Sequence, residues 1–244
     1  MLYKTTSTRK WRTNLTKQLF KLTKESEEYL EAIYKLQKRK GIAKTTEIAR
    51  KLNVALGSVT NTIKCLERKG LVEHEPYKGV RLTEKGVKEA LRVIRKHRLA
   101  ERLLVDALKM EWSKVHEAAC SLEHAITEEM LPYMERALGY PKRCPHGNPI
   151  PSSEGEIIEE KCRPLSSLRA GKIVKIIKIT EESSEILQIL ESYGIKPGKK
   201  MHLLDKDLGR GFVKVRVDKE CCVLNSRLAA AIWVRGEDDE RRRQ

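Results

Sequence analysis

A short proline-rich segment divides this chain into two parts with different periodicity. Four of its 8 prolines fall between Pro141 and Pro151, with Gly147 and Gly155 close by. Before this segment, apolar residues recur at the three- and four-residue spacing of amphipathic helices; after it, they alternate or cluster in short β-branched runs. The segment therefore predicts a linker, and the 244 residues divide among small domains instead of forming one large core.

The first hundred residues show the pattern of a winged helix-turn-helix. Apolar spacing predicts a helix over 23–38, a short helix after Thr45 and a third helix that stops at Gly70. Two short strands over 71–75 and 80–82 follow, joined by a Pro-containing turn. Three helices followed by a hairpin, in this order, are typical of a winged DNA-binding domain.

The third helix and the hairpin carry side chains that suit DNA. The helix residues that we expect to reach base edges and phosphates are small or hydrogen-bonding: Gly57, Ser58, Thr60, Asn61 and Lys64. In the hairpin, Lys78 and Arg81 suit phosphate contacts. Residues 1–100 hold 25 Lys and Arg against 10 Asp and Glu, a net charge of +15. The alternative is a three-helix bundle whose charged face merely meets water.

Three further helical patterns precede the linker. The first runs over about 84–109 after Thr83, the second follows Ser113, and the third spans about 127–138. Their apolar faces exceed what one small winged domain can cover, so we expect a helical dimerisation surface.

The part after the linker reads as a small β domain. Short β runs are expected at 173–179, 200–205, 211–217 and 231–235, interrupted by one helix at about 183–193. An SH3-like barrel fits the length of roughly 75 residues. The expected fold class is mainly α with a small β domain: an N-terminal winged helix-turn-helix, a helical dimerisation domain and a C-terminal SH3-like β barrel.

The expected domain boundaries follow from these changes of pattern. They are a basic N-terminal extension (1–22), a winged helix-turn-helix DNA-binding domain (23–86), a helical metal-binding and dimerisation domain (87–140), a Pro-rich linker (141–162), an SH3-like domain (163–236) and a charged tail (237–244). No run of about 18 apolar residues and no secretory signal is present, so we expect a cytoplasmic protein without membrane contact.

The middle of the chain concentrates metal-ligand side chains. Residues 101–160 hold 6 Lys and Arg against 12 Asp and Glu, a net charge of −6. His97 and Glu101 are four residues apart on one helix face. On the next helix His116, Cys120, Glu123 and His124 have offsets of 0, 4, 7 and 8, within about one third of the helix circumference.

Imidazole, thiolate and carboxylate groups that converge on two adjacent helices predict a divalent transition-metal site. The alternative is a polar helix face with a buried histidine or two, but burying these groups unpaired would be costly. The 6 cysteines form no CxxC pair, and we expect reduced, mostly buried thiols for all but Cys120. Cys144 and His146 in the linker read either as an extra ligand pair or as incidental polar residues of a Pro-rich turn.

At these helices the sequence resembles a known family. The runs Arg95–Leu104 and Lys114–His124, and the linker run Gly147–Pro151, are similar to the corresponding segments of the diphtheria toxin repressor family of metal-dependent regulators. The resemblance covers about residues 23–236. The final domain, at Tyr193–Gly198 and Val223–Val234, resembles ferrous-transport accessory domains.

This resemblance implies two metal sites. The ancillary site would use His97, Glu101 and His116, and the SH3-like domain would add Glu182 and Glu185. The second of these two positions departs from the family pattern, in which it is commonly Gln. An ordinary charged helix start is the alternative for both glutamates.

The primary, activating site implied by the resemblance would use Cys120, Glu123 and His124 with Glu28 from the first helix. Iron-type members usually have Met at the position of Glu28, whereas manganese-type members have an acid both there and at the position of Cys120. This chain mixes the two patterns. We expect Fe²⁺, with Mn²⁺ as the alternative and Co²⁺, Ni²⁺ or Zn²⁺ binding in vitro.

The expected function is metal-dependent repression. We expect a homodimer that binds double-stranded DNA at a palindromic operator, with one or two dimers per operator. This repressor would control metal-homeostasis genes. A metalloenzyme would need an open coordination position and a nearby general base. No nucleophile–base motif or hydrolase signature appears in the sequence, so we expect no enzyme activity. The remaining alternatives are a DNA-binding protein with a purely structural metal and a protein-interaction module on residues 161–236.

Overall fold

The computed structural model describes residues 22–207 and 211–236. The chain divides into two compact units, Met1–Ala90 and Leu91–Gln244. Helix α5, Glu84–Arg102, begins in the first unit and ends in the second. The expected charged tail lies outside the described residues, as does the expected basic extension apart from Leu22. Among the described residues, no helix combines the length and the hydropathy needed to cross a membrane.

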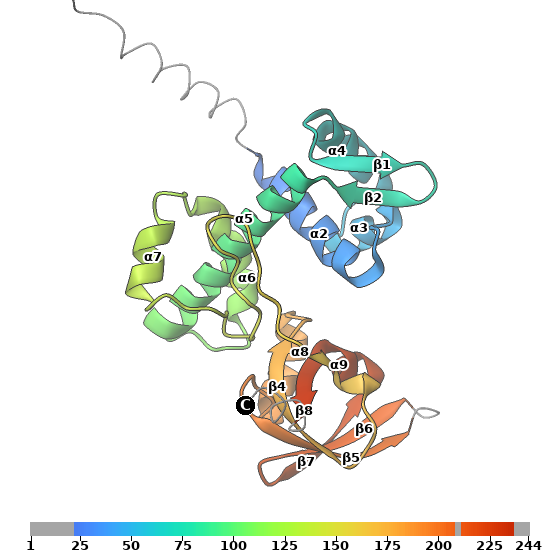
Figure 1. Ribbon diagram of the computed structural model, residues 1–244, viewed down its shortest axis with the longest axis vertical. Coiled ribbons are helices and arrows are strands. Elements are labelled where there is room, and N and C mark those ends of the chain that lie inside the picture. Colours follow the sequence, from blue (N-terminus) through green and yellow to red (C-terminus); the bar gives the residue numbers. More distant parts are fainter. Residues whose placement is uncertain (1–21, 208–210, 237–244) are drawn as a thin grey trace, which may run out of the picture. The chain divides into compact units, whose positions relative to one another are not determined.

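The first unit is the predicted winged helix-turn-helix (Figure 1). It consists of α2 (Lys24–Lys40), α3 (Thr45–Leu52), α4 (Leu56–Arg68), β1 (Val72–Glu75), β2 (Gly79–Leu82) and the start of α5. Helix α2 is capped at both ends. The hydroxyl of Thr23 accepts from the backbone N–H of Ser26 at 3.2 Å, and Gly41 ends α2 with a φ of 78°.

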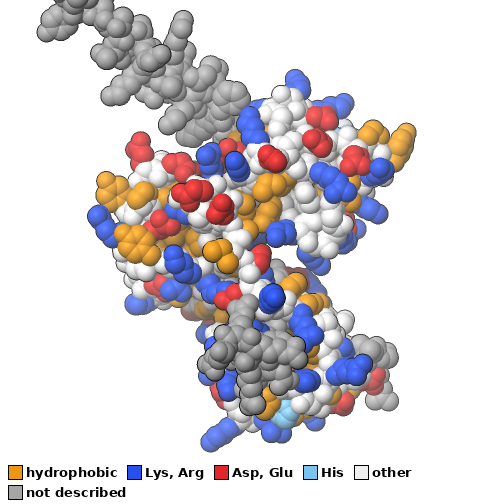
Figure 2. All heavy atoms as spheres, viewed as in Figure 1, with side chains coloured by type: hydrophobic (Ala, Val, Ile, Leu, Met, Phe, Trp, Pro, Cys, Tyr) orange, Lys and Arg blue, Asp and Glu red, His pale blue; other side chains and the backbone are white. Residues whose placement is uncertain are grey.

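Helix α4 packs one face inward and leaves the predicted DNA-contacting face in solvent. Val59, Ile63 and Leu66 are buried. The exposed residues include all five that the sequence analysis selected: Gly57, Ser58, Thr60, Asn61 and Lys64. On the face of the molecule seen in Figure 2, Lys and Arg side chains are interspersed with Asp and Glu.

The β1–β2 hairpin is fastened to the helices by its own backbone and by one arginine. Ala43 and Val80 exchange two backbone hydrogen bonds, of 3.0 and 2.8 Å. Arg81 donates through Nη1 to the carbonyl of Gly41 at 2.7 Å and through Nε to Glu75 at 3.1 Å. Lys78 Nζ also lies 3.1 Å from Glu75. Both predicted phosphate-contacting cations are therefore exposed on the hairpin but share one carboxylate.

The helices before the linker are shorter than predicted. The helix expected over 84–109 gives way after Arg102 to a π-helical turn, Leu103–Ala107. Helix α6, Val115–Leu122, passes into a 3₁₀ turn at Glu123–Ala125. Helix α7, Leu131–Ala137, begins later than predicted because Thr127–Met130 forms a turn and a proline stands in the first helical turn.

The β domain is one antiparallel sheet with the strand order β3-β8-β4-β5-β6-β7. The strands are β3 (Arg163–Pro164), β4 (Lys172–Ile179), β5 (Lys200–Asp207), β6 (Phe212–Val217), β7 (Glu220–Asn225) and β8 (Ile232–Gly236), with the helices α8 (Ser184–Ser192) and α9 (Ser226–Ala231). The expected fold class is confirmed. Strand β7, which contains Cys221 and Cys222, was not predicted.

The cysteine prediction is partly wrong. All six thiols are free, as expected, but only Cys144 is buried, and Cys221 is exposed. For Cys221 and Cys222 the reason is local, because Leu224 is the one buried residue of β7.

The Pro-rich segment does not run freely between its neighbours. The backbone N–H of Ile179 donates to the carbonyl oxygen of His146 at 2.9 Å, and the side-chain amide of Asn148 donates to the carbonyl oxygen of Ile179 at 2.8 Å. Gly147, with a φ of 85°, approaches β4 so closely that a Cβ there would lie 2.1 Å from the carbonyl oxygen of Ile177. The segment expected as a linker is therefore packed along β4.

Gly86 provides a test of the packing in the first unit. A Cβ at this position of α5 would lie 1.9 Å from the carbonyl oxygen of Leu71. Gly86→Ala should therefore lower the free energy of unfolding by about 1–3 kcal/mol, measured by urea denaturation. Gly57→Ala, with nothing within 4 Å of its Cβ, should leave stability unchanged or raise it by less than about 1 kcal/mol. Equal effects of the two substitutions would contradict this packing.

Candidate metal centre

A buried carboxylate lies at the centre of the polar cluster. Glu101, on the last turn of α5, is 0% exposed. Its Oε1 atom lies 3.2 Å from His97 Nε2, 3.4 Å from His116 Nδ1 and 3.0 Å from His146 Nδ1. Among the described residues, its Oε2 atom is buried without a hydrogen-bond partner. An ionised carboxylate with one unsatisfied oxygen and three imidazole neighbours is a costly arrangement that a cation relieves.

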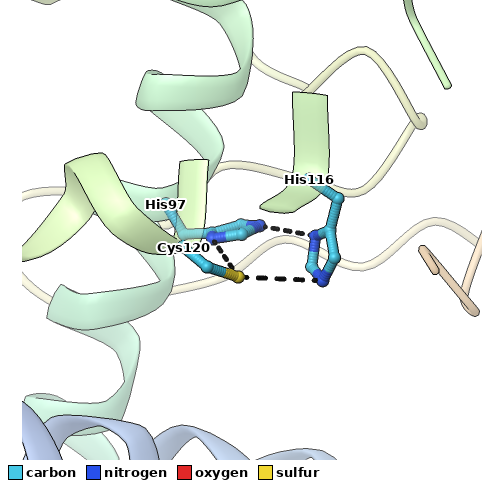
Figure 3. A group of neighbouring side chains, drawn as sticks. All are labelled: His97, His116 and Cys120. Carbon is cyan, nitrogen blue, oxygen red and sulfur yellow. Dashed lines mark hydrogen bonds between the residues drawn. The ribbon is translucent and has the colours of Figure 1, made fainter. Parts of the chain in front are cut away.

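Helices α5 and α6 bring two imidazoles and a thiol together. Figure 3 shows the side chains of His97, His116 and Cys120 pointing toward one another. His97 Nε2 and His116 Nδ1 are 3.0 Å apart, and Cys120 Sγ lies 4.0 Å from His97 and 3.9 Å from His116. Residues four apart on α6 supply the last two, since they share one face of a helix. This is the juxtaposition that the spacing predicted.

The packed segment and the β domain complete the cluster. His146 is 0% exposed, and its second ring nitrogen lies 3.2 Å from the carbonyl oxygen of Trp112. Glu182, just after β4, lies 3.7 Å from His146 Nδ1 and 3.8 Å from His116 Nδ1. The Asn148 amide donates to the Glu182 carboxylate at 2.6 Å. Side chains from four segments far apart in the sequence therefore converge.

Among the residues that the structure describes, three overlapping sets of donor atoms can hold a metal ion. Within each set the donor atoms lie within 4.8 Å of one another, and the sets are His97–His116–Cys120, His97–Glu101–His116–Glu182 and Glu101–Cys144–His146–Glu182. Ligands bound to one ion at about 2.1 Å stand roughly 3.0–3.4 Å apart. The contacts of Glu101 Oε1 with the three imidazoles fall in this range, so the residues fit a transition-metal ion.

The electrostatics show that the cluster is already charged. Burial would lower the pKa of His97, but the Glu101 carboxylate and its other partners raise it well above its usual range. For His146, burial is outweighed by Cys144 and Glu101, which raise the pKa to about 11. Conversely, burial would raise the pKa of Glu101, but the surrounding imidazoles hold it well below its usual value. Without a cation ligand, protons on the imidazoles compensate the buried carboxylate.

Cys120 and His116 shift each other's pKa. Burial would raise the pKa of the Cys120 thiol, but hydrogen bonds with His116 and His97 lower it to about 7. Burial would likewise lower the pKa of His116, whereas Cys120 and Glu101 raise it to about 9. A thiol with this pKa supplies a thiolate at neutral pH, which is the form that binds metal. Cys144 differs, because burial raises the pKa of its thiol.

The residues predicted for the primary site belong to both units: Glu28 to the first, and Cys120, Glu123 and His124 to the second. Glu123 contacts His97, with 2.6 Å between Oε2 and Nδ1, and its Oε1 lies 3.4 Å from His124 Nε2. The expected single stripe on one helix ends at Leu122, because the following 3₁₀ turn changes the direction of Glu123 and His124. Glu28 lies on α2 in the first unit with its side chain 42% exposed, and Lys24 Nζ is 3.8 Å from its carboxylate.

The two glutamates expected from the β domain differ in placement. Glu182 belongs to two of the three donor sets, whereas Glu185, in the first turn of α8, is exposed and belongs to none of them. Sequence reasoning underrated Cys144 and His146, which are 3% and 0% exposed. The signal for these two ligands was a Cys-X-His spacing in an otherwise Pro- and Gly-rich run. It was given little weight because such a run predicts a flexible turn, which would not bury these side chains.

Three family models match the chain in succession. Residues 21–80 match the N-terminal DNA binding domain of iron dependent repressors, residues 83–152 match their metal binding and dimerisation domain, and residues 163–236 match the FeoA domain. A winged DNA-binding domain followed by a buried His, Glu and Cys cluster defines a metal-dependent DNA-binding regulator.

Curated relatives and solved structures agree. The chain is 32% identical over 195 residues to the diphtheria toxin repressor of Corynebacterium efficiens, covering 76% of this chain and 85% of that protein. It is 31% identical over 225 residues to the iron-dependent repressor IdeR of Mycobacterium bovis, covering 87% and 97%. A manganese-dependent transcriptional repressor in complex with manganese matches with a TM-score of 0.82 and 31% identity, covering 86% of this chain and 99% of that one. IdeR from T. acidophilum matches with a TM-score of 0.76 and 34% identity, covering 89% and 99%.

The chain therefore belongs to the diphtheria toxin repressor family of iron- and manganese-dependent transcriptional repressors. The resemblance seen in the sequence is confirmed. Members of this family are DNA-binding transcriptional repressors and not enzymes, as expected.

Replacing the central carboxylate by an amide should weaken metal binding. Because Glu101 contacts three imidazoles and keeps one oxygen unsatisfied, Glu101→Gln should weaken Mn²⁺ and Co²⁺ binding at least about tenfold. A competition titration against a fluorescent chelator measures this. The control is Glu185→Gln, whose exposed side chain should leave the affinity unchanged. If the control weakens binding as much as Glu101→Gln, the placement of these two residues is wrong.

Metal affinity should rise with pH. The raised pKa of His116, about 9, and of His146, about 11, means that both imidazoles carry protons at pH 7, which a metal must displace. Affinity should therefore increase from pH 6 to pH 9. Calorimetry in buffers of different ionisation enthalpy should show proton release, with about one proton fewer for His116→Gln. A pH-independent affinity would show that the imidazoles are neutral before metal binds.

Proposed function

We propose that this protein is a repressor activated by Fe²⁺, with Mn²⁺ as the alternative, that controls metal-homeostasis genes in the cytoplasm. It acts as a homodimer, and one or two dimers bind a palindromic double-stranded operator. The ancillary metal ligands are His97, Glu101, His116 and Glu182. The observation that carries the proposal is the buried, half-satisfied Glu101 carboxylate among three imidazoles, because charge of this kind is retained where a cation binds.

We extend the ligand set beyond the sequence prediction. Cys144 and His146 share donor distances with Glu101 and Glu182, so they serve as ligands in place of the exposed Glu185. Asn148 holds the Glu182 carboxylate through a hydrogen bond of 2.6 Å and so orients it toward the cluster.

The activating site is proposed to join Glu28 to Cys120, Glu123 and His124. Within the second unit, Glu123 already contacts both His97 and His124, so its carboxylate links the two proposed sites. The thiol of Cys120, with a pKa of about 7, favours softer metals, whereas the carboxylates favour harder ones. This mixed donor set supports Fe²⁺, an ion of intermediate character, over a dedicated all-oxygen manganese site.

The regulatory step is a change in the preferred arrangement of the recognition helices. A bound metal would supply the positive charge that imidazole protons otherwise provide beside the buried carboxylates. Helix α5 carries His97 and Glu101 near its end and begins in the DNA-binding unit. A metal that fixes these two side chains would therefore also restrict the part of the helix that belongs to the DNA-binding unit. Operator DNA and metal should then strengthen each other's binding, since coupling between two sites is reciprocal.

The DNA interface is proposed to be the exposed face of α4, with Lys78 and Arg81 of the hairpin on phosphates. Polar and small residues line this face while its opposite side is buried. We retain the domain boundaries expected from the sequence, except that residues 141–162 pack along β4 instead of forming a free linker.

Substitutions in the proposed activating site should change the metal response of DNA binding. Glu123→Ala and His124→Ala should each raise the Fe²⁺ or Mn²⁺ concentration needed for half-maximal DNA binding at least about tenfold. The measurement is anaerobic fluorescence anisotropy with a duplex selected from a random library by the metal-loaded wild-type protein. Glu117→Ala, on the exposed face of α6, is the matched control and should respond like the wild type.

Two results would contradict this model. An unchanged metal requirement in Glu123→Ala and His124→Ala would remove these residues from the activating site. Loss of secondary structure upon chelation, followed by circular dichroism, would show instead that the metal is structural. Cellular transcript levels after Fe²⁺ or Mn²⁺ supplementation then separate the two candidate metals, because affinity in vitro follows general metal chemistry.

A further inference from the structure

A cationic cavity lies beside the metal centre and shares one residue, Cys144, with its donor sets. It has a volume of about 520 Å³ and lies between the end of α5, the packed Pro-rich segment and the strands β4 and β8. Its charged lining consists of Arg102, Lys142, Arg143, Lys175, Arg235 and a single acid, Glu160. Five cations against one carboxylate leave a clear excess of positive charge in a concave site of small-molecule size.

The carboxylates nearby compensate only some of these cations. Glu160 is shared, with one oxygen paired to Arg143 and the other 3.5 Å from Arg235 Nη1. Arg102 pairs with Asp106 at 2.7 Å. Among the residues that the structure describes, neither Lys142 nor Lys175 has an ion-pair partner, and both are exposed. The cavity therefore keeps two ammonium groups available to a ligand.

Strand register adds a second, independent observation. Lys175 of β4 lies directly opposite Arg235 on β8 and opposite Lys200 on β5. Like charges facing each other across neighbouring strands destabilise a sheet. Of these three cations, Lys175 and Arg235 line the cavity, and an anion bound beside them would offset part of their repulsion.

Much of the remaining lining is apolar. Pro141, Pro145 and Pro197, together with Ile176 and Ile177, form this part of the wall. Such a wall suits a flat ring, whereas the cations suit phosphate groups.

We propose that this cavity binds a small polyphosphate anion, either free pyrophosphate or the phosphate chain of a nucleotide. Lys142 and Lys175 supply the ammonium groups, and Arg143 and Arg235 supply guanidinium donors. Cys144 lines the cavity and also belongs to a metal-donor set, so the anion lies next to the metal centre without sharing its carboxylates.

The test is calorimetric titration of the full-length protein with pyrophosphate, ATP and adenosine. Metal is removed first on a chelating resin, because polyphosphates bind divalent cations and a soluble polyanionic chelator would itself compete for the cavity. Pyrophosphate and ATP should bind, and adenosine should not. Tighter binding of ATP than of pyrophosphate identifies the nucleotide class, and equal binding identifies the phosphate chain alone.

Matched charge reversals locate the site. Lys175→Glu and Lys142→Glu should each weaken binding about tenfold or more, since each removes a charge-assisted contact. Both side chains are exposed, so folding should not be impaired. Lys219→Glu, in the exposed turn after β6, makes the same change of charge outside the cavity and should leave the affinity within about twofold.

The acidic run Glu237–Glu240 follows β8 by sequence, so a full-length variant with these four acids changed to amides is titrated in parallel. Binding in either form that is lost in Lys175→Glu supports the proposal. The absence of polyphosphate binding in both forms, or an equal loss in Lys219→Glu, overturns it. A loss of duplex DNA binding in Lys175→Glu without any polyphosphate binding would likewise overturn it and assign this face to DNA.

Discussion

The second unit is organised around the buried charge of Glu101. A carboxylate that is 0% exposed is tolerable only when positive groups surround it, since transferring a lone charge from water into protein costs several kcal/mol. Here His97, His116 and His146 meet one of its oxygens. The protons that they carry in the absence of metal are also what a metal must displace. Burial thus links the stability of this unit to its capacity to sense a cation.

This constraint explains why the Pro-rich segment is ordered. His146 reaches Glu101 only because the segment packs along β4, where the close approach of Gly147 to Ile177 leaves no room for a Cβ. Asn148 fastens the same segment to Ile179 and to Glu182. The β domain therefore contributes Glu182 through this packing. The adjoining cationic cavity arises from the same contact, since the segment forms one of its walls.

Much of the fold was predictable because its signals are local. Periodicity identified α2, α3, α4 and the β1–β2 hairpin to within a few residues, since each element buries one face of its own sequence. The elements that were missed depend on contacts elsewhere. The cysteine-containing strand β7 has no clear alternation, and the 3₁₀ turn at Glu123 interrupts a stripe that looked continuous.

The sequence by itself determined the kinds of ligand atom and their spacing along α5 and α6, because residues four apart on a helix necessarily share a face. It also indicated the family and the domain order. Only the tertiary structure decided that Cys144 and His146 are buried beside Glu101, while Glu185 faces solvent and Glu182 faces the cluster. The physical reason is that the burial of these four side chains depends on how segments far apart in the sequence pack together. The spacing of residues within one segment carries no information about such contacts.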